Sequence, residues 1–451
     1  MNVKALAIHL GESLRLGVLF RYELAADTVV TRFVADEAFI AREGMPTVSA
    51  AWLADSSVQQ QALWRDVRAV GFNGRRSVQN GWLLPAFFQN LLPEGVFRDR
   101  VAELRGCDPK DHFEMLAACG RDLPGDVRAL PVNLSRDELA RYVTQQQDAL
   151  EMSVTADPLE EGVSLSGVQP KVGAIREGDR YVARTRDHDT HIIAKLPVVA
   201  QPRLPEVEAL SLRLAAAAGV TVCEAWLEPL SKLAVAHGYD LGDADAATNF
   251  LAVRRYDRDA PGRVHCEDFA QVLGVMPEDK YGGGVRGYLD VAAVLMGFES
   301  LGEAAVHELL RRLVVNEMLG NPDMHLKNIG LVYPDGRNPR LAPAYDVVAY
   351  AAYSRNQGHA LALLPPDLLP PGSASARTRQ QLSPAVLRVF CSALRIPEKP
   401  AAAVIREAVR SATRLWPSMI EGSALTALQK SRLMSQFEGH GMVQSLARRL
   451  S

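Results

Sequence analysis

The sequence contains few cysteines, and their positions suit neither disulfide bonds nor a metal. Its 451 residues include five cysteines, an odd number with no paired spacing. They are Cys107, Cys119, Cys223, Cys266 and Cys391. This pattern argues against a disulfide framework and against a cysteine zinc site. We therefore expect a reducing, cytoplasmic compartment.

Long apolar runs and a large excess of one charge are also missing. No apolar run approaches the ~20 residues needed to cross a bilayer, and the first ten residues lack the apolar core of a secretion signal. We expect a protein that is neither membrane-spanning nor secreted. The formal net charge is −3, which does not indicate a nucleic-acid binder.

The composition is that of a globular protein with a large core. Hydrophobic residues make up 48% and charged residues 23%, and the length predicts two or three domains. Residues 1–135 form a small mixed domain, in which a helical stretch over 83–105 is interrupted at Pro93. Residues 136–260 favour strands and one helix, which begins at Pro205 and ends at Gly219. Residues 261–451 are mainly helical. The expected helices there cover 289–299, 303–319, 384–394, 400–415 and 423–448.

Residues 164–171 form neither a Gly-x-Gly-x-x-Gly loop nor a Walker A motif, but a pair of polar residues further along has the spacing of a kinase catalytic loop. Asp323 and Asn328 are separated as in the Asp-x-x-x-x-Asn catalytic loop of kinases. In such loops the aspartate orients the attacking hydroxyl and the asparagine binds metal. The pair follows a helix that ends near Gly320, so it lies on a loop. An ordinary polar turn is the alternative.

A second aspartate lies downstream of Asn328, at a sequence separation that suits a metal ligand of a kinase. Asp346 comes 18 positions after Asn328 (346 − 328), and phosphoryl transfer requires a metal-binding aspartate downstream of the catalytic loop. The residues between them, 329–341, are typical of a hairpin that returns Asp346 to the loop. An exposed aspartate at a strand end is the alternative.

A lysine lies within an apolar strand. Lys195 follows Ile192, Ile193 and Ala194, and a lysine in such a setting needs a partner or an exit to water. In kinases this lysine binds the α- and β-phosphates and pairs with a glutamate on a helix. Glu208 is the preferred partner, Glu206 the alternative. A solvated lysine on an edge strand remains the other interpretation.

Residues Ser164–Lys171 add a fourth element. Their serines and glycine precede a strand and are suited to presenting main-chain N–H groups to phosphate. Taken alone this signal is weak. The order along the chain strengthens it, because the phosphate segment, strand lysine, helix glutamate, catalytic loop and metal aspartate follow one another as in kinases.

These motifs resemble the HipA-like serine/threonine kinases of bacterial toxin–antitoxin systems. The matching segments are residues 88–95, 120–122, 164–171, 254–258, 265–269, 279–281, 323–328 and 343–346. The resemblance implies an α+β, bilobal protein-kinase-like fold, with a β-rich N-lobe (136–260), a helical C-lobe (261–451) and a small mixed α/β N-terminal subdomain (1–135).

The resemblance also implies roles for individual residues. Asp323 is expected to be the catalytic base, Asn328 and Asp346 the Mg²⁺ ligands, and Ser164 an autophosphorylation site that switches the protein off. The main chain of Arg254 and Tyr256 is expected to contact adenine. The expected ATP-binding set is Ser166, Gly167, Val168, Gln169, Pro170, Lys171, Lys195, Glu208, Arg254, Arg255, Tyr256, His325, Leu326, Lys327, Asn328, Tyr345 and Asp346. His325 has no second histidine nearby, so we interpret it as a structural loop residue and not as a zinc ligand.

The family further implies a protein substrate, such as an aminoacyl-tRNA synthetase, and a small helix-turn-helix antitoxin. DNA would be contacted indirectly through that antitoxin. This chain departs from the family at Arg254, where an acidic residue is frequent, and at Cys266, where glutamine is frequent. Neither departure touches the catalytic groups.

Two other functions are consistent with the same motifs. One is a small-molecule phosphotransferase on the same scaffold. The other is a non-catalytic regulator that acts with an antitoxin on DNA, where Arg377 and Arg379 would contact phosphates. The intact catalytic set argues against the second as the sole role.

Overall fold

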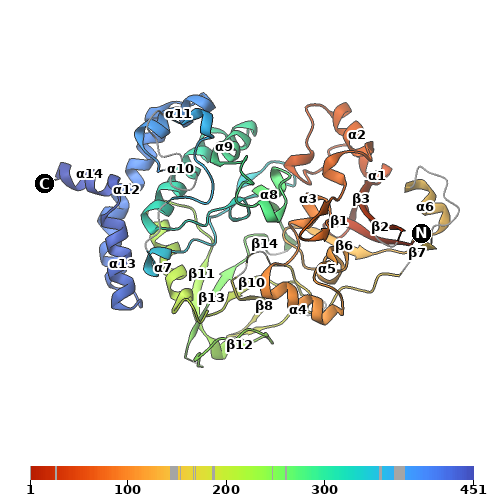
Figure 1. The fold of residues 1–451 in the computed structure, drawn as a ribbon, viewed down its shortest axis with the longest axis horizontal. Helices are drawn as coiled ribbons and strands as arrows, with labels where there is room; N and C mark the ends of the chain where they lie inside the picture. Colours follow the sequence, from red (N-terminus) through yellow and green to blue (C-terminus); the bar gives the residue numbers. More distant parts are fainter. Residues whose placement is uncertain are drawn as a thin grey trace.

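A computed structural model describes residues 2–25, 28–142, 151–152, 154–165, 167, 169–184, 188–245, 247–259, 262–354, 358–369 and 381–450. Arg377 and Arg379 lie outside this part of the chain. Figure 1 shows three regions in sequence order, from the N-terminal sheet through a second sheet to a group of helices that ends the chain. None of the described helices is long and apolar enough to cross a membrane.

The N-terminal region is built on an antiparallel sheet. Its strands, in spatial order, are β3 (Thr28–Ala35), β2 (Leu14–Ala25), β1 (Asn2–Leu10) and β6 (Val127–Pro131), and β7 (Glu151–Met152) runs parallel to the start of β1. Leu6, Ile8 and Leu10 alternate along β1 and enter one buried core. Aromatic side chains fill that core, and Phe33 stacks on Trp52 with ring centroids 6.0 Å apart.

Short helices cover this sheet. They are α1 (Glu37–Ile40), α2 (Ser57–Arg65), α3 (Ala86–Gln89), α4 (Gly95–Arg105), α5 (His112–Cys119) and α6 (Arg136–Tyr142), and β4 (Arg76–Ser77) pairs with β5 (Gly81–Trp82). The expected interruption at Pro93 is confirmed, because α3 ends before it and α4 begins after it. The loop between these two helices extends toward the rest of the chain.

The middle region contains a six-stranded sheet. Its order is β11 (Ala225–Pro229), β13 (Asn249–Arg254), β10 (Ile192–Lys195), β8 (Lys171–Glu177), β9 (Arg180–Val182) and β12 (Leu233–Ala234). Helix α7 (Leu204–Ala217) packs on β11 and β13. Pro205 lies in its first turn, and Gly219, with φ of +90°, ends it as expected.

The C-terminal region combines a small sheet with a helical layer. The sheet consists of β16 (His265–Asp268), β17 (Gly330–Tyr333) and β18 (Arg340–Leu341), and β14 (Arg258–Asp259) pairs with β15 (Gly262–Arg263) just before it. The helices are α8 (Phe269–Val272), α9 (Tyr288–Gly297), α10 (Gly302–Leu319), α11 (Pro384–Leu394), α12 (Glu398–Glu421), α13 (Ala427–Glu438) and α14 (Gly441–Leu450). Helix α10 lies at the centre of this core, where Leu309, Leu313 and Met318 are fully buried.

One expected helix was wrong. The stretch 423–448 is two helices, α13 and α14, separated at Gly439 and His440. The break coincides with Gly439 and Gly441, which disfavour a helix interior, and there His440 Nε2 lies 3.0 Å from the buried Glu317 carboxylate on α10.

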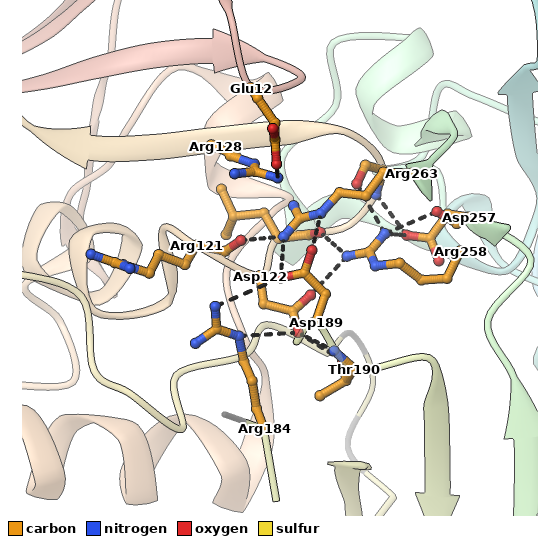
Figure 2. Close-up of polar contacts among 12 residues, drawn as sticks. Glu12, Arg121, Asp122, Arg128, Arg184, Asp189, Thr190, Asp257, Arg258 and Arg263 are labelled. Atoms are coloured by element: carbon orange, nitrogen blue, oxygen red, sulfur yellow. Dashed lines mark hydrogen bonds and ion pairs between the residues drawn. The ribbon is translucent and has the colours of Figure 1, made fainter. Parts of the chain in front are cut away.

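A buried ionic network joins the N-terminal region to the segment 254–258 (Figure 2). The Asp122 carboxylate is fully buried. It accepts hydrogen bonds from Thr190 N–H at 2.9 Å and from Arg258 Nη2 at 2.7 Å. Asp257 accepts a further bond from the main-chain N–H of Gly125 at 2.7 Å. Burial alone would raise the pKa of Asp122, but the arginines around it lower it overall.

Candidate active site

The side chain of Lys195 joins two carboxylates from different elements. Its ammonium, on β10, contacts both the Glu208 carboxylate on α7 and the Asp346 carboxylate. Lys195 and Glu208 are buried, whereas the Asp346 side chain is 27% exposed. The expected pair with Glu208 is therefore confirmed, and Glu206 instead accepts a hydrogen bond from Asn249 at 3.1 Å.

The charges of this group depend on one another. Burial would lower the pKa of Lys195, but Asp346 and Glu208 raise it overall. Burial would likewise raise the pKa of Asp346, but Lys195 and then Lys171 lower it to about 2. Lys195 is thus held as a cation and Asp346 as an anion at neutral pH. Lys171, at the start of β8, is buried beside them and its pKa is lowered by burial.

The backbone brings Asp346 to this lysine by the expected route. The hairpin β17–β18 occupies the residues between Asn328 and Asp346. After it, Ala344 N–H donates to the carbonyl of Thr221, and the N–H of Cys223 donates back to Ala344. Asp346 itself has φ of +52°, in the left-handed region that a non-glycine residue seldom adopts. The segment is therefore fixed to residues 221–223, which lead into β11, and Asp346 turns toward Lys195.

The loop after α10 has internal hydrogen bonds that define its shape. Gly320, with φ of +61°, ends the helix. The Asn328 side-chain amide donates to the main-chain oxygen of Asp323 at 2.7 Å, and Asn321 Oδ1 accepts from the N–H of Asp323 at 3.1 Å. The Asp323 carboxylate accepts a hydrogen bond from Tyr281 at 2.8 Å. Asp323 and Asn328 therefore belong to one ordered loop, and Asn328 faces the same cavity as Asp346.

A cavity lies between the six-stranded sheet, the catalytic-type loop and the N-terminal region. Its apolar side is formed by Ile193, Cys223, Val253, Tyr256 and Tyr345. The rings of Tyr256 and Tyr345 lie 5.4 Å apart between centroids. Its polar side carries Lys171, Lys195, Asn328 and Asp346. An apolar side beside a charged side suits a ligand with a flat ring and anionic groups.

The structure separates the residues expected at the ATP site into three groups. Lys171, Lys195, Arg254, Arg255, Tyr256, Lys327, Asn328, Tyr345 and Asp346 line the cavity. Gly167, Gln169, Pro170, Glu208, His325 and Leu326 do not line it, and neither does Asp323, the expected catalytic base. Ser166 and Val168 lie outside the described residues. Glu208 acts on the cavity only through Lys195, and Leu326 is fully buried in the core of the C-terminal region.

Arg254 and Arg255 make contacts that differ from the expected contacts with ATP. The main-chain N–H of Arg254 donates to the carbonyl of Glu224 at 2.9 Å, so this group is occupied. The Arg254 side chain pairs with the Glu224 carboxylate at 3.3 Å near the surface. The guanidinium of Arg255 turns into the buried network, where it bonds Asp257 at 2.9 Å. The Arg255 side chain therefore belongs to the buried ionic network around Asp122, whereas the Arg254 side chain does not.

Ser164 is buried beside the cavity. Its side chain is 1% exposed, and its hydroxyl donates to the main-chain oxygen of Leu91 in the N-terminal region. Its N–H donates to the carbonyl of Asp122 at 3.0 Å. The segment before β8 is thus packed against two N-terminal loops.

Sequence reasoning missed several residues of the cavity. Asn90 and Pro124 enter it from the N-terminal region, and Asp268 and Cys223 from two other segments. Asn90 lies in the stretch 88–95, whose buried Gln89 and Asn90 side chains were the available signal. Polar residues within an apolar, buried stretch require partners. Asn90 finds one of them in the C-terminal region, where its side-chain amide donates to the main-chain oxygen of Val275 at 2.8 Å.

Comparison with known families agrees with this architecture. A model of the HipA N-terminal domain matches residues 7–130, and a model of the HipA-like C-terminal domain matches residues 163–416. The chain belongs to the HipA-like family. Its fold is accordingly the expected bilobal one, with a sheet-rich part and a helical part that follow the N-terminal sheet.

Two curated relatives carry kinase names. The putative kinase Y4dM of Sinorhizobium fredii is 38% identical over 274 residues, which cover 60% of this chain and 63% of that protein. The putative kinase Y4mE of the same organism is 33% identical over 325 residues, covering 68% of this chain and 72% of that protein. The match to Y4dM thus spans less than two thirds of its length.

A solved structure shares the fold over nearly the whole chain. It is the HipA protein of Shewanella oneidensis MR-1, from a toxin–antitoxin complex with HipB and operator DNA. The TM-score is 0.65 at 20% identity, and the match covers 98% of this chain and 99% of that one. At this identity the likeness establishes the arrangement of elements.

Proposed function

We propose that the chain is an ATP- and Mg²⁺-dependent serine/threonine protein kinase of the HipA-like toxin type. The observation that carries the proposal is the bridge from Lys195 to Glu208 and Asp346 at the charged side of the cavity. Kinases use a strand lysine, paired with a helix glutamate, to hold the α- and β-phosphates. The apolar side, with Val253 and Tyr256, suits adenine.

The donor groups suit magnesium. Asn328 and Asp346 offer an amide oxygen and a carboxylate to the same cavity. The described residues contain no cluster of three or more histidine, cysteine, aspartate or glutamate side chains that would form a dedicated metal cage. Mg²⁺ ordinarily binds one or two protein oxygens together with substrate phosphates, so Asn328 and Asp346 would hold it. Bound there, it would neutralise charge on the phosphates.

Asp323 would serve the hydroxyl that accepts the phosphoryl group. Its carboxylate accepts a hydroxyl hydrogen bond from Tyr281, which is the kind of contact that a substrate hydroxyl would make. In the transfer, the acceptor oxygen bonds to the γ-phosphorus, the bond to the leaving ADP oxygen breaks, and the acceptor proton passes to Asp323. Asn328 holds the main chain of Asp323 in position meanwhile.

Autophosphorylation of Ser164 would act as an off-switch. The buried hydroxyl bonded to Leu91 has no room for a phosphate, which adds a charge of about −1.5 to −2. Modification therefore requires the segment to leave its packed position. Because Leu165 and Lys171 of the same segment line the cavity, its departure would dismantle the phosphate side of the site.

The biological setting follows from the family. We infer a small helix-turn-helix, HipB-like antitoxin as partner, contact with operator DNA through that complex, and a translation component such as an aminoacyl-tRNA synthetase as substrate. The complex of the Shewanella HipA with HipB and operator DNA supports the first two. The absence of a charge excess in this chain fits DNA contact that is mediated by the partner.

Nucleotide binding tests the site directly. Titration of the chain with Mg-ATP in a calorimeter should give one binding event per chain. Lys195→Met should weaken it at least tenfold, about 1.4 kcal/mol, because the lysine that would contact the phosphates is then missing and no longer balances the charge of Asp346 in the cavity. The matched control is Lys232→Met, which removes a lysine that pairs with Glu228 at the surface. Equal binding by the Lys195 variant and the control would contradict the proposal.

A further inference from the structure

The hydroxyl of Tyr281 is hydrogen-bonded to the Asp323 carboxylate. It donates to Oδ1 at 2.8 Å, and among the described residues it supplies the one hydrogen bond to that carboxylate. Burial and the Asp323 charge raise the pKa of Tyr281, so the hydroxyl keeps its proton and remains a donor. The ring meets His325 edge-on, with centroids 5.1 Å apart at 85°. Tyr281 thus occupies an acceptor position on Oδ1 while 52% of the tyrosine stays exposed.

The Tyr281 hydroxyl occupies the position next to Asp323 that the hydroxyl of a substrate would need for phosphoryl transfer. Proton transfer to a general base needs the acceptor oxygen within about 2.6–3.2 Å of the base. Tyr281 meets that distance from the solvent side of Asp323. A serine or threonine hydroxyl cannot donate to the same oxygen in the same place while Tyr281 is there.

The tyrosine is anchored on one side. Lys280, the residue before it, pairs with Glu94 of the N-terminal region at 3.0 Å. The carbonyl of Lys280 also accepts a hydrogen bond from the N–H of Leu326 at 3.1 Å. The chain up to Lys280 is therefore attached to the loop that carries Asp323, which holds Tyr281 within reach of it.

The chain after Tyr281 begins with three glycines, which can adopt other backbone conformations more readily than other residues. Gly282, Gly283 and Gly284 follow directly, with φ of +87°, +51° and +88°. Three consecutive residues in this region require glycine, and glycine has the widest choice of alternative conformations. Val285, next in the chain, is 79% exposed. Movement after Tyr281 thus exposes little new apolar surface.

We propose that Tyr281 occupies the acceptor-hydroxyl site, and that a peptide segment bearing serine or threonine must displace it to be phosphorylated. The inference rests on the proposed kinase function. The acceptor enters from the solvent side of Asp323, where Tyr281 is 52% exposed. Tyr281 takes no part in bond making; it competes with the acceptor for Asp323, and so favours acceptors that bind the surrounding surface well enough to replace it.

Steady-state kinetics with a defined acceptor tests the inference. The probe is a synthetic peptide that copies residues 158–171, and ADP release is followed against peptide and ATP concentration. Tyr281→Phe removes the competing hydrogen bond, and its net value of ~0.5–1.5 kcal/mol corresponds to a two- to tenfold lower KM for the peptide. Tyr281→Ala also removes the ring and should lower this KM further. The KM for ATP and kcat should stay within twofold.

Tyr353→Phe is the matched control, since its hydroxyl donates to Pro202 at 3.1 Å, away from Asp323. A fall in kcat with unchanged peptide KM would overturn the inference, because Tyr281 would then be supporting Asp323. A peptide that leaves ADP release unchanged in the wild type and both variants would also overturn it. No ADP release by the wild-type chain under any condition would instead contradict the proposed function.

Discussion

The side-chain nitrogen of Lys327 lies 2.9 Å from the main-chain oxygen of Asn90, which is 237 positions earlier in the sequence. Lys327 is buried next to Asn328, in the loop that begins at Asp323. Its ammonium also lies 3.4 Å from Glu94 and 3.3 Å from Asp268. The N-terminal region therefore helps to hold the loop that we assign to catalysis.

Glu94→Gln should impair transfer more than nucleotide binding. Burial alone would raise the pKa of Glu94, but Lys327 and Lys280 lower it to about 2, so at neutral pH it is their anionic partner. Without that charge the loop loses a fixed contact, and small misplacements of reacting groups cost up to ~100-fold in rate. We expect kcat to fall about ten- to a hundredfold, while the KM for ATP changes little.

The control for this change is Glu103→Gln, which removes an exposed glutamate paired with Arg100 on α4. Glu94→Asp should restore part of kcat, because it restores the charge. An equal loss of ATP affinity and kcat in Glu94→Gln would indicate general unfolding and contradict a positioning role.

Ser164→Asp should reproduce the effect of phosphorylation. An aspartate has no hydroxyl to donate to Leu91, and it would place an unpaired charge where the side chain is 1% exposed. We expect the affinity for Mg-ATP in calorimetry to fall at least tenfold, about 1.4 kcal/mol. Limited proteolysis should also begin to cut within residues 154–171. Ser164→Ala, which adds no charge, should keep both properties near those of the wild type, and equal behaviour of the two variants would refute this switch.

The local elements of the site were predictable, because their signals lie within a few residues of each other. Pro205 and Gly219 mark the ends of α7, and the apolar strand around Lys195 demands a partner that α7 supplies at Glu208. The spacing of Asp323 and Asn328 describes one loop. Each of these depends on backbone rules that act over a single turn or strand.

The contacts between regions were not predictable from such signals. Asp122 lies in a stretch that indicates a tight glycine- and proline-containing loop, yet it is fully buried and bonds Arg255, 133 positions away. The same holds for the contact between His440 and the buried Glu317, which lie 123 positions apart in the sequence. Nothing in the neighbouring residues distinguishes a solvated charge from one whose partner is brought to it by the tertiary fold.

Glu267 should make stability depend on pH. It is buried between the N-terminal region and β17, where it accepts hydrogen bonds from Ser49 and Tyr333. Burial raises its pKa from 4.5 to about 7, and the hydrogen bonds only partly oppose this. Between pH 4.5 and about pH 7, the Glu267 carboxyl has lost its proton in the unfolded chain but retains it in the folded chain. The free energy of unfolding contributed by Glu267 therefore falls as the pH rises through this window.

Glu267→Gln removes that dependence. From pH 5 to pH 8, the free energy of unfolding of the variant relative to the wild type should rise by about 2 to 3 kcal/mol. Urea unfolding at the two pH values measures this difference. Glu299→Gln, at an exposed position, is the matched control. A relative stability of the Glu267 variant that stays constant between pH 5 and 8 would show that the buried carboxyl is already ionised.

The most direct measurement is phosphate transfer by the wild type and by Asp323→Asn. Both proteins are incubated with Mg-ATP labelled in the γ-phosphate, and label on the chain and on candidate translation proteins is quantified by mass spectrometry. Asparagine has the size of aspartate and still offers an oxygen to the Tyr281 hydroxyl. It cannot, however, take up the proton of the substrate hydroxyl. We expect the wild type to label Ser164 or a protein substrate, and the variant to retain ATP binding while transfer falls at least a hundredfold, about 2.7 kcal/mol. Equal labelling by the two proteins would contradict the assignment of Asp323 and, with it, the kinase mechanism.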